Sequence, residues 1–218
     1  MKSGSLVRMV VAVSLLLPAA MSAAPNEASA CGALVRKAVD PKSLTVARAE
    51  QSLGDGKHAQ AAAGVAVAFP AIKAAKPGES PLSDRALRIL ALATVRANGV
   101  IAVRGMQGNT PAGRAANLQW SVDTIRKLSA RRANNATFQT DLGEALSKLP
   151  KHHAEALKIL GDLATKDLLT SAEGYAALAK LRAASGDAPG REAAVKRCEG
   201  MAKAPNICQA GADSNSRS

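Results

Sequence analysis

Aromatic residues are scarce in this sequence, whose 218 residues include one Trp, one Tyr and two Phe. β-Branched residues are also sparse, whereas Ala, Leu, Lys, Arg, Glu and Gln are abundant. Strands favour aromatic and β-branched residues, and helices favour the second group. The composition therefore argues against an all-β fold and against a Rossmann-type fold, and it predicts an all-α protein.

Residues that could catalyse a reaction or bind a metal are few. His58, His152 and His153 are the only imidazoles, and no His-x3-His or His-Glu-x-x-His motif occurs. Adjacent residues of a helix point about 100° apart, so His152 and His153 do not form a metal-binding pair. There is no Gly-x-Ser-x-Gly motif, and Gly54-x-Gly56 lacks the strand that precedes a phosphate loop. We therefore expect no enzyme activity, no metal and no cofactor.

Long apolar runs are absent apart from one at the N-terminus. Lys2 and Arg8 precede an apolar run over residues 9–17, and small residues follow it. This pattern is typical of a secretory signal peptide, and the run is too short to span a bilayer. Cleavage could follow Ala24 or Ala30, and we favour Ala30. The chain is thus expected to be exported to the periplasm or the extracellular space.

Cysteines are only three, and no Cys-x-x-Cys motif is present. In an exported chain Cys198 and Cys208, ten residues apart with Pro205 between them, are the expected disulfide. Cys31 would be the first residue after cleavage at Ala30, and residues 28–31 resemble a lipoprotein lipobox with Ala where Leu is usual. However, the polar stretch 25–27 separates Cys31 from the apolar run. Cys31 is therefore a lipidation site, a free thiol or an alternative partner of Cys198.

The formal net charge is +12, which favours anionic partners. The densest basic cluster, Arg126, Lys127, Arg131 and Arg132, is spread over a helix face. All four aromatic residues occupy core-like positions, so no stacking platform for single strands is expected. A nucleic-acid partner is not expected, whereas an anionic envelope surface remains an alternative partner.

Helix start signals recur along the chain. Asp40-Pro41, Ser80-Pro81 and Thr110-Pro111 each place a capping side chain before a Pro at the first helical position. The segment from Thr170 to Glu173 resembles a capping box. With the apolar periodicity, these signals predict eight helices, at about 41–54, 57–74, 82–99, 111–131, 135–149, 152–166, 171–185 and 189–203. Short turns between them predict antiparallel helical hairpins.

Several positions resemble the tetratricopeptide repeat, which has about 34 residues per hairpin. Leu142-Gly143 matches the Leu-Gly pair of the first helix, and Leu92-Ala93 and Leu178-Ala179 replace Gly by Ala. In the second helices the family's alanine is matched by Ala59, Ala116, Ala156 and Ala193, and its Phe position by Trp120 and Leu160. Arg96 and Arg182 stand where Tyr is expected, and the repeat spacing is longer than the family's. A generic α-solenoid or an irregular helical bundle would produce the same periodicity.

The resemblance implies a right-handed solenoid of about four antiparallel helical hairpins. The expected organisation is a signal peptide at 1–30, a single helical-repeat domain at 31–204 and a flexible tail at 205–218. In the family, the first helices line a concave groove that holds a protein or peptide. Carried over to this sequence, the groove positions are Arg48, Gln51, Thr94, Asn98, Thr140, Glu144, Lys148 and Lys180.

The leading functional hypothesis is therefore an exported scaffold that binds a protein partner, in an envelope complex. The alternative is a basic structural envelope protein that adheres to anionic lipid or polysaccharide through its surface charge.

Overall fold

A computed structural model describes residues 40–204 and 206–209, and this part of the chain is all-α, with no strand. The predicted signal peptide, Cys31 and residues 210–218 lie outside the described residues. The helices are α1 (Pro41–Gly54), α2 (His58–Ala68), α3 (Pro81–Arg96), α4 (Pro111–Ala130), α5 (Ala136–Leu146), α6 (His153–Thr165), α7 (Ala172–Ala184), α8 (Ala188–Met201) and α9 (Asn206–Gln209), with 3-10 turns at Ile72–Ala74 and Pro150–His152.

Three of the helices begin where the sequence predicts them to begin. The side chains of Asp40, Ser80 and Thr110 each accept a hydrogen bond from the backbone N–H three residues later, at 3.0 Å in every case. Each is followed by a proline at the first helical position. These side chains satisfy amides that have no partner inside the helix, which fixes the starts of α1, α3 and α4.

Three helices, α2, α3 and α5, end earlier than the periodicity predicts, and α5 stops at Leu146 instead of residue 149. α2 stops at Ala68 instead of continuing to residue 74, because Pro70 cannot donate the backbone hydrogen bond that a continuing helix needs. α3 stops at Arg96, and Asn98 and Gly99 adopt positive φ angles of 51° and 82°. Such left-handed residues terminate a helix, and they turn the chain into the loop before α4.

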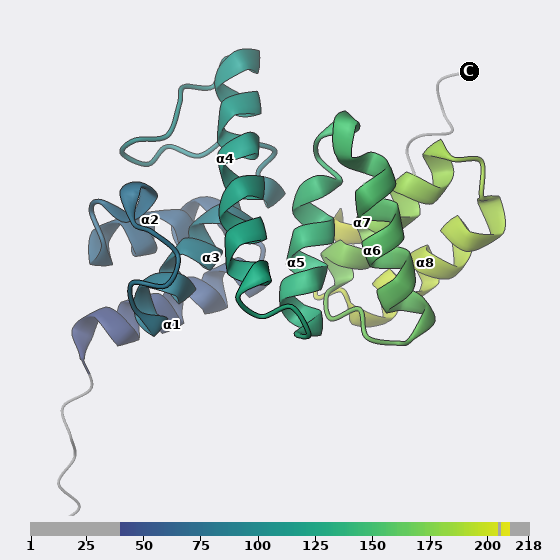
Figure 1. Ribbon diagram of the computed structural model, residues 1–218, viewed down its shortest axis with the longest axis horizontal. Helices are drawn as coiled ribbons and strands as arrows, with labels where there is room; N and C mark the ends of the chain where they lie inside the picture. The colour runs from purple at the N-terminus through teal and green to yellow at the C-terminus, as the bar shows by residue number, and fades with distance from the viewer. Residues whose placement is uncertain (1–39, 205, 210–218) are drawn as a thin grey trace, which may run out of the picture. The chain divides into compact units, whose positions relative to one another are not determined.

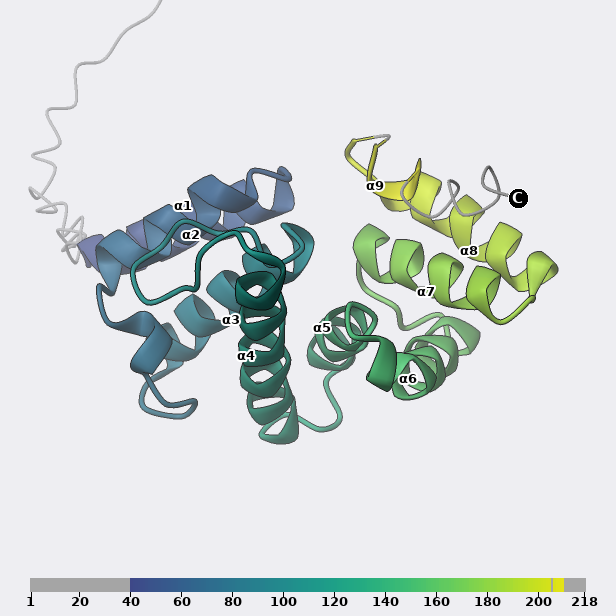
Figure 2. The same cartoon turned by 90° about the horizontal axis from the view of Figure 1, so that it is seen from above.

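The helices pack as sequential antiparallel pairs, α1 with α2, α3 with α4, α5 with α6 and α7 with α8 (Figures 1 and 2). Each pair also contacts the next one along the chain. In addition, the first helices of successive pairs contact each other, α1 with α3, α3 with α5 and α5 with α7. This arrangement confirms the prediction of sequential helical hairpins.

The core is made mainly of Ala, Leu, Ile and Val, and α3 contributes most to it. Leu87, Ile89, Leu90 and Leu92 of α3 are each at most 1% exposed. A helix that is apolar on nearly all sides must be covered by neighbours on nearly all sides. α3 accordingly contacts α1, α2, α4 and α5.

The resemblance to the repeat family holds best in the α5–α6 pair. Gly143 packs against Leu160, and a Cβ atom added at Gly143 would lie 2.6 Å from two atoms of that leucine. Ala156 and Leu160 are fully buried. By contrast, Ala59, Ala116 and Ala193 are exposed, so their match to the family's packing alanine is wrong.

The C-terminal part of the described chain is held by the predicted disulfide. Cys198 on α8 and Cys208 on α9 are bonded and buried. α9 also packs against α7. Residues 206–209 of the predicted flexible tail are therefore helical and attached to the last hairpin. Among the described helices, none is long and apolar enough to cross a membrane.

Candidate functional site

A pocket of about 550 Å³ lies beside the first helices of the last three hairpins, and we call it the α3–α5–α7 pocket. Its wall also includes the α1–α2 turn, the start of α6 and the segment of α9. The lining residues are Asp55, Gly56, His58, Arg96, Asn98, Glu144, Ser147, Lys148, His153, Glu173, Ala176, Ala177, Lys180, Leu181, Ala184, Ala204, Asn206 and Ile207. A volume of this size is in the usual range for ligand pockets.

Arg96 is the central charged group of this wall, and its side chain is only 10% exposed. Its Nε and Nη2 donate to the two carboxylate oxygens of Glu144 at 2.9 and 3.0 Å. Its Nη1 lies 2.8 Å from Oε1 of Glu173. Burial alone would lower the pKa of Arg96, but the two carboxylates outweigh burial and raise it. One guanidinium therefore joins α3, α5 and α7.

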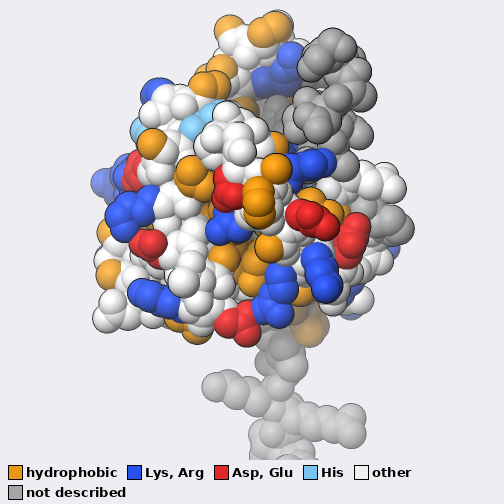
Figure 3. All heavy atoms as spheres, turned by 90° about the vertical axis from the view of Figure 1, so that its right-hand side faces the viewer, with side chains coloured by type: hydrophobic (Ala, Val, Ile, Leu, Met, Phe, Trp, Pro, Cys, Tyr) orange, Lys and Arg blue, Asp and Glu red, His pale blue; other side chains and the backbone are white. Residues whose placement is uncertain are grey.

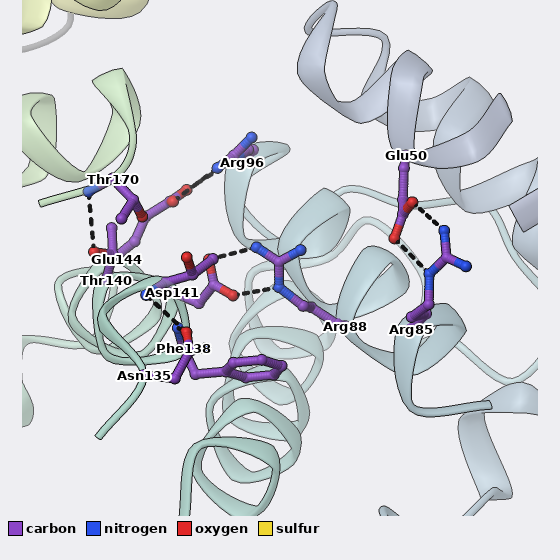
Figure 4. Close-up of polar contacts among 11 residues, drawn as sticks. Glu50, Arg85, Arg88, Arg96, Asn135, Phe138, Thr140, Asp141, Glu144 and Thr170 are labelled. Atoms are coloured by element: carbon purple, nitrogen blue, oxygen red, sulfur yellow. Dashed lines mark hydrogen bonds and ion pairs between the residues drawn. The ribbon is translucent and has the colours of Figure 1, made fainter. Parts of the chain in front are cut away.

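A second ion pair joins the same two helices, α3 and α5, nearer the N-terminal end of each (Figure 4). Arg88 donates from Nε and Nη2 to the two carboxylate oxygens of Asp141, at 2.5 and 3.1 Å. The guanidinium of Arg88 also lies 5.6 Å from the centre of the Phe138 ring. Burial raises the pKa of Asp141, against the charge of Arg88, which lowers it. These contacts fix how α5 sits on α3 and so position Glu144 in the pocket.

Lys148 follows α5 and is half-buried in the pocket wall. Its Nζ donates to Oδ1 of Asn98 at 2.8 Å. Among the described residues it forms no ion pair, and the nearby Glu144 is bonded to Arg96. Burial lowers the pKa of Lys148, Glu144 opposes this effect, and the charges of Lys180 and Arg96 add to it.

Two histidines also line the pocket. His58, the first residue of α2, is half-buried, and burial together with the charge of Arg96 lowers its pKa. The ring Nε2 of His153 lies 3.1 Å from the backbone oxygen of Ser147. No group of three or more His, Cys, Asp or Glu residues in the described ranges could hold a metal ion.

The apolar lining comes mainly from α7 and the segment of α9, and the wall also contains Asp55, Lys180 and Asn206. Ala176, Ala177 and Leu181 of α7 and Ile207 of α9 line the pocket, and α7 packs against α9. The Cys198–Cys208 disulfide ties α9 to α8, and so it keeps Ile207 in this wall. The pocket lining therefore combines charged residues with small apolar residues, as ligand pockets commonly do.

Four of the eight groove positions taken from the family line this pocket: Asn98, Glu144, Lys148 and Lys180. The other four do not. Thr94 and Thr140 are fully buried, the first bonded to the backbone oxygen of Leu90 and the second accepting from the N–H of Thr170. Arg48 and Gln51 are exposed on α1.

The sequence did not point to Arg96 and Glu173 as site residues. Arg96 stands where the repeat family has Tyr, so in the sequence it is only a departure from the family pattern. Glu173 reads as the partner of Thr170 in a capping box, but the cap of α7 is Ser171, whose hydroxyl accepts from the N–H of Gly174 at 3.0 Å. This leaves Glu173 available to Arg96. A local sequence signal for this pair is lacking, because Arg96 lies on α3 and Glu173 on α7, with the hairpin of α5 and α6 between them.

No protein-family model, no curated protein and no solved structure matches this chain.

Proposed function

We propose that this chain is an exported scaffold of stacked helical hairpins that binds a segment of a partner protein in the α3–α5–α7 pocket. The observation that carries the proposal is the position of the pocket. It lies along first helices that contact one another in succession, which is where a solenoid of hairpins presents its extended binding surface. The positions shared with the tetratricopeptide repeat support the same arrangement.

The N-terminal segment supports the export part of the proposal. A short positive stretch, an apolar run and small residues occur in the order that signal peptides have. The disulfide agrees with it, because disulfides persist in oxidising compartments outside the cytosol. The proposed scaffold has no catalytic role.

A change of shape without a change of charge tests the pocket. Ala184 is exposed at the end of α7 and lines the pocket, so Ala184→Trp should fill part of it. Ala154 is exposed on α6 away from the lining, and Ala154→Trp is the matched control. We expect Ala184→Trp to reduce the capture of partner protein from envelope extract, and Ala154→Trp to leave it unchanged. Equal capture by the two variants would contradict the proposal.

The alternative function, adhesion of the basic surface to anionic lipid or polysaccharide, is favoured by the net charge of +12. On the face drawn in Figure 3, however, Lys and Arg side chains are interspersed with Asp and Glu. Adhesion through surface charge should vanish at a few hundred millimolar salt, because the Debye length then falls well below about 8 Å. Capture in the pocket should largely survive, so measurements at two salt concentrations separate the functions.

A further inference from the structure

We propose that the α3–α5–α7 pocket binds a single carboxylate side chain of the partner segment, held between Lys148 and Lys180. This inference rests on the proposed function and adds the chemistry of the ligand. The two lysines come from consecutive hairpins, Lys148 from the turn after α5 and Lys180 from α7.

The first argument is the number of donors that Lys148 leaves free. An ammonium group has three N–H donors, and Asn98 Oδ1 is the one hydrogen-bond acceptor found for it in the described part of the chain. Asn98 is neutral, so the positive charge of Lys148 is not matched by a bonded carboxylate. Glu144 lies nearby and attracts Lys148, but its oxygens are bonded to Arg96, and no ion pair between Glu144 and Lys148 is found in the described part of the chain.

The second argument is electrostatic. Burial lowers the pKa of Lys148, the charge of Glu144 raises it, and the positive charges of Lys180 and Arg96 lower it further, so that the pKa is lowered overall. A carboxylate between the two lysines would offset the effects of burial and of these two cations, and it would gain charge-assisted hydrogen bonds. Lys180 itself is exposed and has no ion pair within the described ranges, so it is available to the same ligand.

The third argument concerns how much negative charge the ligand carries. Asp55, Glu144 and Glu173 lie in the same wall and would repel a second or third anionic group. The apolar side chains of Ala176, Ala177 and Ile207 line the same pocket and favour small apolar neighbours. A protein segment with one acidic residue among small apolar residues fits this wall, whereas a densely charged polyanion does not.

Capped pentapeptides provide the test. The probe is acetyl-Ala-Ala-Glu-Ala-Ala-amide, its neutral control has Gln in place of Glu, and dissociation constants are measured by NMR titration. We expect the Glu peptide to bind about tenfold more tightly, which is the usual effect of a hydrogen bond between charged groups. The preference should disappear in Lys148→Gln and in Lys180→Gln. It should persist in Lys127→Gln and Lys196→Gln, which remove the same charge at exposed positions of α4 and α8.

The outcomes are distinct. Equal binding of the two peptides, no binding of the Glu peptide, or a preference that survives in Lys180→Gln would overturn the inference. If both peptides bind equally and Ala184→Trp weakens both, the pocket still binds protein segments and only the carboxylate assignment fails. If Ala184→Trp has no effect and heparin competes, the proposed function fails as well.

Discussion

At the scale of single residues, Lys148 lies in surroundings that disfavour its charge. It is half-buried beside two other cations, and it donates to a neutral amide. A residue chosen for stability alone at this position would be apolar. Ionisable groups held in such unfavourable surroundings are typical of functional sites.

The substitution Lys148→Met should show the effect of these surroundings through its pH dependence. Because burial lowers the folded-state pKa of Lys148, the folded chain loses this proton more readily than the unfolded chain, whose value is near 10.5. The free energy of unfolding contributed by this group therefore rises with pH between those two pKa values. We expect Lys148→Met to be more stable than the natural chain at pH 7, with the difference shrinking toward pH 10.5. Urea unfolding over this pH range measures it, with exposed Lys196→Met as the control.

At the scale of helical elements, the close approach of α5 and α6 depends on one glycine. Gly143 of α5 packs against the side chain of Leu160 of α6, and there is no room for a Cβ atom at Gly143. Gly161, the next residue on α6, has nothing within 4 Å of an added Cβ. The two glycines therefore differ in packing although both lie inside helices.

This difference predicts opposite effects of the same substitution. Gly143→Ala should push Leu160 out of place and lower the free energy of unfolding by about 1–3 kcal/mol, the usual effect of overpacking. Gly161→Ala should raise it by roughly 0.5–1 kcal/mol, because alanine favours the helix. Urea unfolding midpoints measure both. A stabilising Gly143→Ala would mean that α5 and α6 are further apart than described here.

At the scale of the whole molecule, buried ion pairs between residues far apart in the sequence connect the hairpins. Arg96 and Glu144 are 48 residues apart, and Glu173 adds the next hairpin. Glu144 is 3% exposed and Glu173 is 21% exposed. Removing Arg96 would leave both carboxylates without their cation inside the protein.

We therefore expect Arg96→Met to lower the free energy of unfolding by about 3–5 kcal/mol. Arg85→Met is the matched control on the same helix, since Arg85 pairs with Glu50 but is 46% exposed. Exposed pairs of this kind contribute at most about 1 kcal/mol. Chemical unfolding of the two variants compares them. A loss for Arg96→Met no larger than that for Arg85→Met would show that the buried network is not needed to hold the hairpins together.

The sequence by itself determined the helical class, most helix starts and the hairpin order, and it favoured the Cys198–Cys208 pairing. Each of these depends on residues close together in the chain, such as Ser80 and the N–H of Ser83, or two cysteines ten residues apart. Only the tertiary structure decided which polar residues meet. It buried Thr94 and Thr140, and it brought Arg96, Glu144 and Glu173 together. The reason is physical: a cap or a tight turn is fixed by local geometry, whereas a contact between hairpins depends on how every intervening helix packs and rotates.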